Sequence, residues 1–158
     1  MGDQAAEWLR TALKQRCRLL RIGASYSRQV RPEKIAPVHR SPQGADISFT
    51  DAFPTLLTAE ESLAELNGRL PHPIPMSRFR PNIVVRGGAP YEEDTWSAVR
   101  TETLVFGCAS PNLRCIVTTT DQQTGARDGP EPLRTLATYR RAPDGSGVLA
   151  APIDSKLE

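Results

Sequence analysis

The chain is poor in the residues that bind zinc or form disulfides. It has three cysteines, Cys17, Cys108 and Cys115, and two histidines, His39 and His72. The spacing of the cysteines matches no zinc motif. Three cysteines are also too few for a plant-type iron–sulfur cluster. Both histidines lie in proline-rich segments without a partner at ligand spacing. A disulfide framework and a histidine-based metal site are therefore not expected.

Long apolar runs are also missing. No stretch approaches the ~20 residues that a membrane-spanning helix needs, and the N-terminus lacks the apolar core of a signal peptide. These absences predict a cytoplasmic protein with no membrane partner. The net charge of +2 gives no reason to expect a nucleic acid partner either.

Lysine is scarce among the basic residues. Lys14, Lys34 and Lys156 are the only lysines among twenty basic residues, and the rest are arginine. The planar arginine fork suits phosphate and carboxylate groups, although biased codon usage gives the same composition. The length of 158 residues, with 39% hydrophobic and 24% charged residues, fits one globular domain.

The first third of the chain combines one helical pattern with a long irregular segment. Residues 3–17 have the apolar spacing of an amphipathic helix, and Asp3 is a suitable N-cap. Residues 17–22 predict a short strand. The segment 23–50 is polar and proline-containing and predicts a long loop, which is usually functional or disordered.

The clearest local unit is "FPTLLTAEESLAELNGRL", residues 53–70. A short apolar strand runs into Thr58, and Glu61 three residues later completes a capping box. Leucines then recur at helical spacing, and Asn67-Gly68 supplies a stop signal. This segment predicts a strand followed directly by a helix.

Further strands are expected at residues 78–88, 101–107 and 114–121, with a short helix at 131–141 and a tail at 143–158 that contains little beyond one turn. Strands outnumber helices and are separated by irregular loops. The pattern therefore predicts a mainly β fold of the α+β class, an antiparallel sheet closed into a barrel with helices outside.

Two groups of polar residues are candidates for a binding or catalytic role. In an extended strand Arg78, Arg80 and Asn82 point the same way, which gives a face suited to a phosphate-bearing ligand or to surface ion pairs. The acidic turn at residues 92–94 has two interpretations: it provides a general base, or it is a solvent-exposed loop without a catalytic role.

Cys115 stands at the head of the β-branched run "CIVTTT". A cysteine on a strand is usually a small buried hydrophobe. The adjacent Arg114 favours a thiolate if the two side chains come close. In the strand interpretation Thr118 and Thr120 share one face, where their hydroxyls are available as donors, while β-propensity alone also explains the threonines.

Five segments occur in a distinctive order: "FPTLLTAEESLAELNGRL", "RFRPNIVVRG", "EEDTW", "RCIVTTTDQQTG" and "EPLRTLATYRR". Together they resemble the MOSC domain of the molybdenum-cofactor proteins, most closely the mitochondrial amidoxime-reducing components and their bacterial relatives. The resemblance runs from about Asp3 to about Arg141.

This resemblance implies a MOSC-type β-barrel that binds molybdenum-molybdopterin. It implies that Cys115 is the protein ligand to molybdenum and the catalytic residue, and that Arg80, Asn82, Leu113 and Arg114 bind the cofactor. The implied activity is an oxidoreductase reaction, the two-electron reduction of a small N-hydroxylated substrate. The electrons are then expected from a separate redox protein or a fused iron–sulfur domain.

The sequence also departs from the family pattern. Asn112 and Leu113 replace a cysteine and a serine that are frequent in the family, and the barrel is expected to be incomplete at both ends. The expected division is a linking helix and strand at 1–22, the MOSC domain at 23–142 and an irregular tail at 143–158. A separate N-terminal barrel or self-association would complete the site. The alternatives are a non-catalytic sulfur-carrier or cofactor-handling module, and an inactive remnant.

Overall fold

The computed structural model describes residues 2–30, 46–50, 53–127, 129–142 and 147–157, with side chains described as far as residue 148. The helical elements are α1 (Asp3–Leu13), α2 (Glu60–Arg69), α3 (Leu133–Leu136) and the short 3-10 helices η3 (Met76–Arg78), η4 (Glu92–Thr95) and η5 (Ile116–Thr119). The strands are β1 (Thr55–Ala59), β2 (Ile83–Val85), β3 (Ala98–Arg100), β4 (Val105–Arg114) and β5 (Val148–Leu157).

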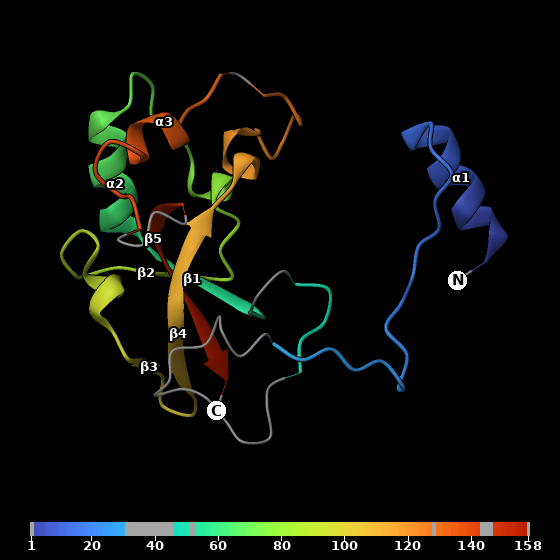
Figure 1. Cartoon of the computed structure of the whole chain (residues 1–158), viewed down its shortest axis with the longest axis horizontal. Helices are drawn as coiled ribbons and strands as arrows, with labels where there is room; N and C mark the ends of the chain where they lie inside the picture. The colour runs from blue at the N-terminus through green and yellow to red at the C-terminus, as the bar shows by residue number, and fades with distance from the viewer. Residues whose placement is uncertain (1, 31–45, 51–52, 128, 143–146, 158) are drawn as a thin grey trace.

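The five strands form one sheet in the order β2-β1-β5-β4-β3 (Figure 1). Strands β1 and β2 run parallel, and every other neighbouring pair is antiparallel. The prediction of a mainly antiparallel sheet with few helices is therefore confirmed. Because β2 and β3 are edge strands, the described residues form an open sheet and no closed barrel.

The apolar core lies in two clusters. One contains Val30, Ile47, Phe53 and Ala109. The other joins Leu66 of α2 and Leu70, the residue after that helix, to Phe79 and to Leu136 of α3. Both helices therefore pack at one end of the sheet (Figure 1). The leucine spacing of residues 53–70 correctly predicts this buried helix face, since burial of such side chains from water is the main driving force for packing.

Helix α1 lies away from the sheet, connected to it by an extended segment (Figure 1). Its Trp8 and Leu13 are 69% and 61% exposed. The helix begins after the N-cap residue Gly2, so Asp3 is its first residue and not its cap, and it ends at Leu13 because Lys14 adopts a left-handed conformation. The short strand predicted at 17–22 does not form.

The strand–helix unit forms as predicted, but its capping box does not. Ala59 is the N-cap residue of α2, and no side chain caps the helix from that position. The Thr58 hydroxyl lies 3.2 Å from the Met76 sulfur, and the Glu61 carboxylate accepts the amide of Gly87 at 2.7 Å. The Thr58 and Glu61 side chains, which the capping box would use, therefore make tertiary contacts instead.

The tail contradicts its prediction as an irregular segment. Its residues Val148–Leu157 form β5, which occupies the centre of the sheet between β1 and β4. The Asp144-Gly145 turn lies outside the described residues. The strand predicted at 101–107 divides into a turn and the start of β4, because the Leu104 and Thr101 backbones meet in a tight hydrogen-bonded turn.

Candidate functional site

Cys115 lies immediately beyond the end of β4, as the residue before η5. It is exposed and unbridged, whereas Cys108 of the same strand is only 6% exposed. Burial raises the pKa of the Cys108 thiol, which disfavours its reactive thiolate form. The interpretation of Cys115 as a buried cysteine is therefore wrong, and that description fits Cys108.

The residues after Cys115 form a 3-10 turn and not the predicted strand. The Cys115 carbonyl accepts the Thr118 amide at 3.2 Å and the Thr118 hydroxyl at 3.0 Å. The Thr119 hydroxyl donates to the Ile116 carbonyl at 2.7 Å. Both threonines are 1% exposed. Their hydroxyls therefore hold the turn together, as Ser and Thr side chains do when they bond to nearby backbone, and the predicted alternation of faces is wrong.

Arg114 connects the cysteine segment to the segment "RFRPN". Its guanidinium donates to the Asn112 side-chain oxygen at 2.6 Å and to the Phe79 carbonyl at 2.8 Å. It also lies 5.4 Å from the centre of the Phe79 ring. The planar fork of arginine suits several directed bonds at once. Two segments that are distant in sequence are thereby held side by side, next to Cys115.

The three residues predicted to share one strand face do not share it. Arg78 ends η3, and Arg80 has a φ of 56°, in the left-handed region, although the following proline predicts an extended residue. Arg80 is exposed, and its amide donates to the Ser77 carbonyl at 3.1 Å. The chain therefore turns sharply here, and the regular alternation of a strand is lost.

Asn82 has a structural contact with the neighbouring strand. Its side-chain oxygen accepts a hydrogen bond from the backbone amide of Leu56 at 2.9 Å, and its backbone N–H donates to the Leu56 carbonyl at 2.8 Å. These bonds place the segment at the start of β1. The side-chain oxygen is therefore occupied, while the amide NH₂ group keeps its donor capacity.

Arg78 is largely buried, with 14% of its side chain exposed, and lies 3.9 Å from the Asp121 carboxylate. The pKa of Asp121 is lowered by hydrogen bonds from the backbone amides of Thr124 and Gln123, and further by the Thr124 hydroxyl and the charge of Arg78. Because η3 packs against η5, this pair lies beside the turn that follows Cys115.

Leu113 is 47% exposed and pairs with Leu149 in the β4–β5 ladder. A side chain in place of Gly147 would lie 3.4 Å from a Leu113 methyl group. Of the five residues that the sequence assigns to the cofactor site, Leu113, Arg114 and Cys115 are thus consecutive at the end of β4, and Arg80 and Asn82 belong to the segment that Arg114 contacts.

The acidic turn is not a solvated loop at Glu93, which is fully buried. The Ser62 hydroxyl lies 2.7 and 2.9 Å from its two carboxyl oxygens, and the Ala59 amide donates to one of them at 3.3 Å. Ser62 in turn accepts the Tyr91 amide at 2.8 Å. Burial raises the pKa of Glu93 although these hydrogen bonds oppose it. Glu93 anchors the start of α2, where a helix favours a negative group.

A second polar network surrounds Glu65. Its carboxylate accepts hydrogen bonds from the Tyr91 and Tyr139 hydroxyls, which lie 2.6 Å from each other. Arg140 binds Asp94 and lies 4.3 Å from the centre of the Tyr91 ring. Neither this network nor the burial of Glu93 has a signal in the sequence pattern, because each depends on residues far apart in the chain.

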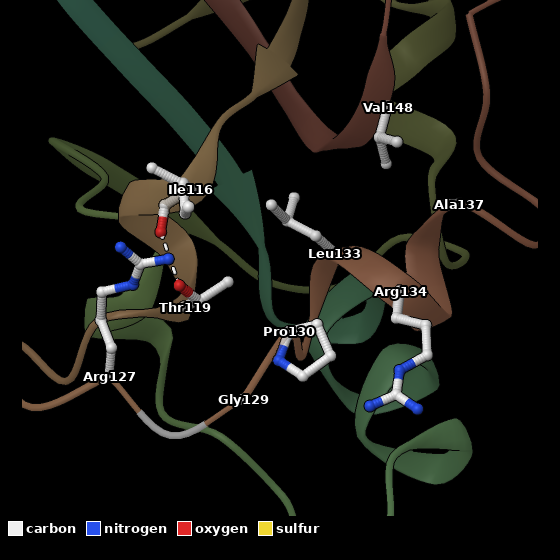
Figure 2. A pocket seen from close by; sticks show the side chains of 9 residues that line it. All are labelled: Ile116, Thr119, Arg127, Gly129, Pro130, Leu133, Arg134, Ala137 and Val148. Atoms are coloured by element: carbon white, nitrogen blue, oxygen red, sulfur yellow. Dashed lines mark hydrogen bonds between the residues drawn. The ribbon is translucent and has the colours of Figure 1, made fainter.

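An apolar pocket of about 730 Å³ opens beside the turn that follows Cys115 (Figure 2). It is lined by residues of η5, of the segment leading into α3, of α3 itself and of the start of β5: Ile116, Thr119, Arg127, Gly129, Pro130, Leu133, Arg134, Ala137 and Val148. Pockets of this size and character typically bind small molecules.

Within the part of the chain that the structure describes, no three His, Cys, Asp or Glu side chains lie close enough together to hold a metal ion.

Residues 44–153 match the MOSC domain family. The chain is 36% identical over 140 residues to the mitochondrial amidoxime-reducing component 1 of Mus musculus, a match that covers 88% of this chain and 40% of that protein. The Homo sapiens protein of the same name is 36% identical over 140 residues, with 89% and 41% covered. The Danio rerio protein is 36% identical over 145 residues, with 88% and 42% covered. The chain thus spans about two fifths of the length of these relatives.

The expectation of a cytoplasmic location is contradicted by these comparisons, because the relatives are named as mitochondrial components. Among the helices that the structure describes, none combines the length and the apolar character needed to cross a membrane.

Proposed function

Because the chain belongs to the MOSC domain family, we propose that it binds the molybdenum cofactor through Cys115 and takes part in the reduction of N-hydroxylated compounds. The observation that carries this proposal is the exposed cysteine at the end of β4, held beside the "RFRPN" segment by Arg114, in a chain that is 36% identical to amidoxime-reducing components.

The residues at the end of β4 have the chemistry that this cofactor needs. A cysteine thiolate is a soft ligand and suits a metal that is already bound by sulfur. Arg80 is exposed and has no acidic partner among the described residues, so its guanidinium is available for the phosphate of the pterin. The NH₂ group of Asn82, which has no hydrogen bond within the described ranges, adds a donor, and Leu113 adds its backbone. Arg114 keeps the two segments in register.

When bound, the cofactor supplies the two-electron redox chemistry, and the protein supplies binding and orientation. For an amidoxime, the N–O bond breaks, two electrons and two protons are consumed, and an amidine and one water molecule are formed. The electrons come from an external redox protein. The chain's own residues hold the cofactor and orient the N–O bond toward it.

The rest of the site is proposed to come from another polypeptide region. The chain spans about two fifths of its relatives' length, and its described sheet is open at β2 and β3. Unpaired sheet edges are the usual places for an added strand. A separate N-terminal barrel or a second copy of the chain is the proposed complement.

The test is metal analysis after expression in a host that makes the cofactor, with and without a co-expressed N-terminal region of an amidoxime-reducing component. We expect molybdenum to copurify with the unaltered chain and with Cys17→Ser, the matched control, and to be lost in Cys115→Ser. Equal molybdenum in Cys115→Ser and the unaltered chain would contradict the assigned ligand. A complete lack of molybdenum in every combination would contradict the proposed function.

A further inference from the structure

The pocket beside Cys115 is lined mostly by apolar groups, which suit an apolar ligand. In Figure 2 Ile116 and Leu133 extend toward the hollow from opposite elements, η5 and α3, and Val148 lies across from them. The Thr119 hydroxyl on this wall is already bonded to the Ile116 carbonyl, so it does not add a free polar group. The pocket therefore favours a hydrocarbon body over a strongly hydrated one.

The size of the pocket limits the ligand. A volume of about 730 Å³ lies within the range of pockets that enclose drug-sized molecules. A single aromatic ring with a substituent at each end fits within it, whereas a short aliphatic compound leaves most of the apolar wall without contact. The volume of the pocket therefore favours ring-sized ligands over short aliphatic ones.

The two arginines of the pocket are not equivalent. Arg134 lies 3.2 Å from the Glu131 carboxylate, which compensates its charge, and its guanidinium points away from the hollow in Figure 2. Arg127 has no acidic partner among the described residues, and it lines the side formed by η5. A cation at an apolar pocket that has no acidic partner among the described residues favours a ligand that carries an anionic group.

The pocket is also adjacent to the proposed metal ligand. Ile116 directly follows Cys115, and consecutive Cα atoms are about 3.8 Å apart. A ring that lies against Ile116 is therefore next to the residue that carries the proposed metal ligand. Because the threonine hydroxyls hold that turn, the wall and the cysteine keep a fixed relation.

We propose that this pocket binds the ring-sized apolar body of an N-hydroxylated substrate that carries a carboxylate, with the carboxylate at Arg127 and the N–O group toward Cys115. This inference rests on the proposed function for the identity of the reacting group. The size and charge selection rest on the pocket itself.

The test compares three probes in isothermal titrations with the purified chain: 4-carboxybenzamidoxime, benzamidoxime and acetamidoxime. We expect binding in that order of strength. Arg127→Gln is expected to weaken 4-carboxybenzamidoxime about fivefold, the effect of losing about 1 kcal/mol from one partly solvated ion pair, and to leave benzamidoxime unchanged. The matched control is Arg100→Gln on the exposed strand β3.

A second variant tests the volume. Ala137→Leu adds side-chain bulk to the pocket wall and is expected to weaken both ring-containing probes at least about tenfold, or about 1.4 kcal/mol. Ala64→Leu, on the exposed surface of α2, is the matched control. Melting curves of both variants establish that each is folded.

The outcomes separate this inference from the proposed function. Ring binding that Ala137→Leu abolishes, combined with no reduction by the molybdenum-loaded protein, supports the pocket and overturns the function. Reduction with a KM that Ala137→Leu does not change supports the function and overturns the pocket assignment. Equal affinities for the two benzamidoximes overturn the role of Arg127.

Discussion

Two regions of the molecule have opposite character. The closed region, defined as residues 59–66 with 91–94, encloses Glu93 in hydrogen bonds. Strand β4 shows the same contrast along its own length, because Phe106, Cys108 and Ala109 in its first half are buried. The open end, defined as residues 113–119, presents Cys115 to solvent. One strand therefore carries a packing cysteine and an accessible one.

The difference teaches how the site is supported. In the closed region, polar groups are buried and bonded to one another, so their removal leaves unsatisfied partners. At the open end, the threonines bond to their own turn, and the cysteine side chain has no structural task in the described residues. Substitutions in the first region are expected to change stability, and substitutions in the second to change ligand binding.

The largest expected effect on stability is from Glu93→Ala. The substitution leaves the Ser62 hydroxyl and the Ala59 amide without their buried acceptor, and we expect a loss of about 3 kcal/mol in the free energy of unfolding. Chemical denaturation measures it. Glu102→Ala, on the exposed turn before β4, is the control and should change little. A similar stability for both variants would remove the distinction between the regions.

The same carboxyl group predicts a pH dependence. Burial raises the pKa of Glu93 in the folded protein above its unfolded value, so the folded state binds the proton more tightly. The contribution of Glu93 to stability is then complete below the unfolded pKa and is lost as pH rises through the folded pKa. Denaturation at several pH values should show a smaller loss on raising the pH in Glu93→Gln than in the unaltered chain. Parallel pH profiles would contradict the raised pKa.

Cys108→Ser is expected to have the next largest effect. It places a hydroxyl in an apolar environment where Cys108 is 6% exposed, and burial of a hydroxyl without a partner costs about 2 kcal/mol. Cys108→Ala, which adds no polar group, should be less destabilised. Denaturation midpoints of the two variants measure this difference. If Cys108→Ser is as stable as the unaltered chain, the first half of β4 is accessible to water.

The sequence predicts the parts of this molecule that depend on local pattern. The strand–helix unit at 53–70 follows from leucine spacing, and the family follows from the order of five segments, which the comparisons confirm. The assignment of Cys115, Arg80 and Asn82 to one cofactor site follows from the resemblance and stays a prediction. The structure shows a contact between the neighbouring residues Arg114 and Phe79.

Other features are set by tertiary contacts that no local pattern contains. Arg80 turns to a positive φ because the 3-10 turn before it and the Asn82–Leu56 bonds after it fix the chain on both sides. The burial of Glu93 requires the distant Ser62. Strand β5 forms from a tail with weak local signals because β1 and β4 provide partners on both sides. These features depend on contacts between distant parts of the chain, so local sequence patterns do not predict them.

Tyr139→Phe tests the polar network of the closed region with a smaller change. It removes the hydroxyl that lies 2.6 Å from Tyr91 and 3.2 Å from Glu65, but keeps the ring over which Arg69 lies at 4.1 Å. We expect a loss of about 1 kcal/mol, the net value of a typical hydrogen bond. Tyr26→Phe is the matched control, because the Tyr26 hydroxyl has no bond among the described residues. Equal denaturation midpoints for both variants would contradict the network's contribution.

The smallest expected effect on stability is from Cys115→Ser. The side chain is exposed at the end of β4, and exposed substitutions usually change the free energy of unfolding by less than about 0.5 kcal/mol. The same exchange at Cys108 thus becomes a direct comparison along one strand. If Cys115→Ser unfolds as readily as Cys108→Ser, then the open end contributes to the fold, and a loss of molybdenum in that variant no longer identifies a ligand. If Cys115→Ser keeps its stability and loses the metal, then structure and metal binding are separated within a single strand.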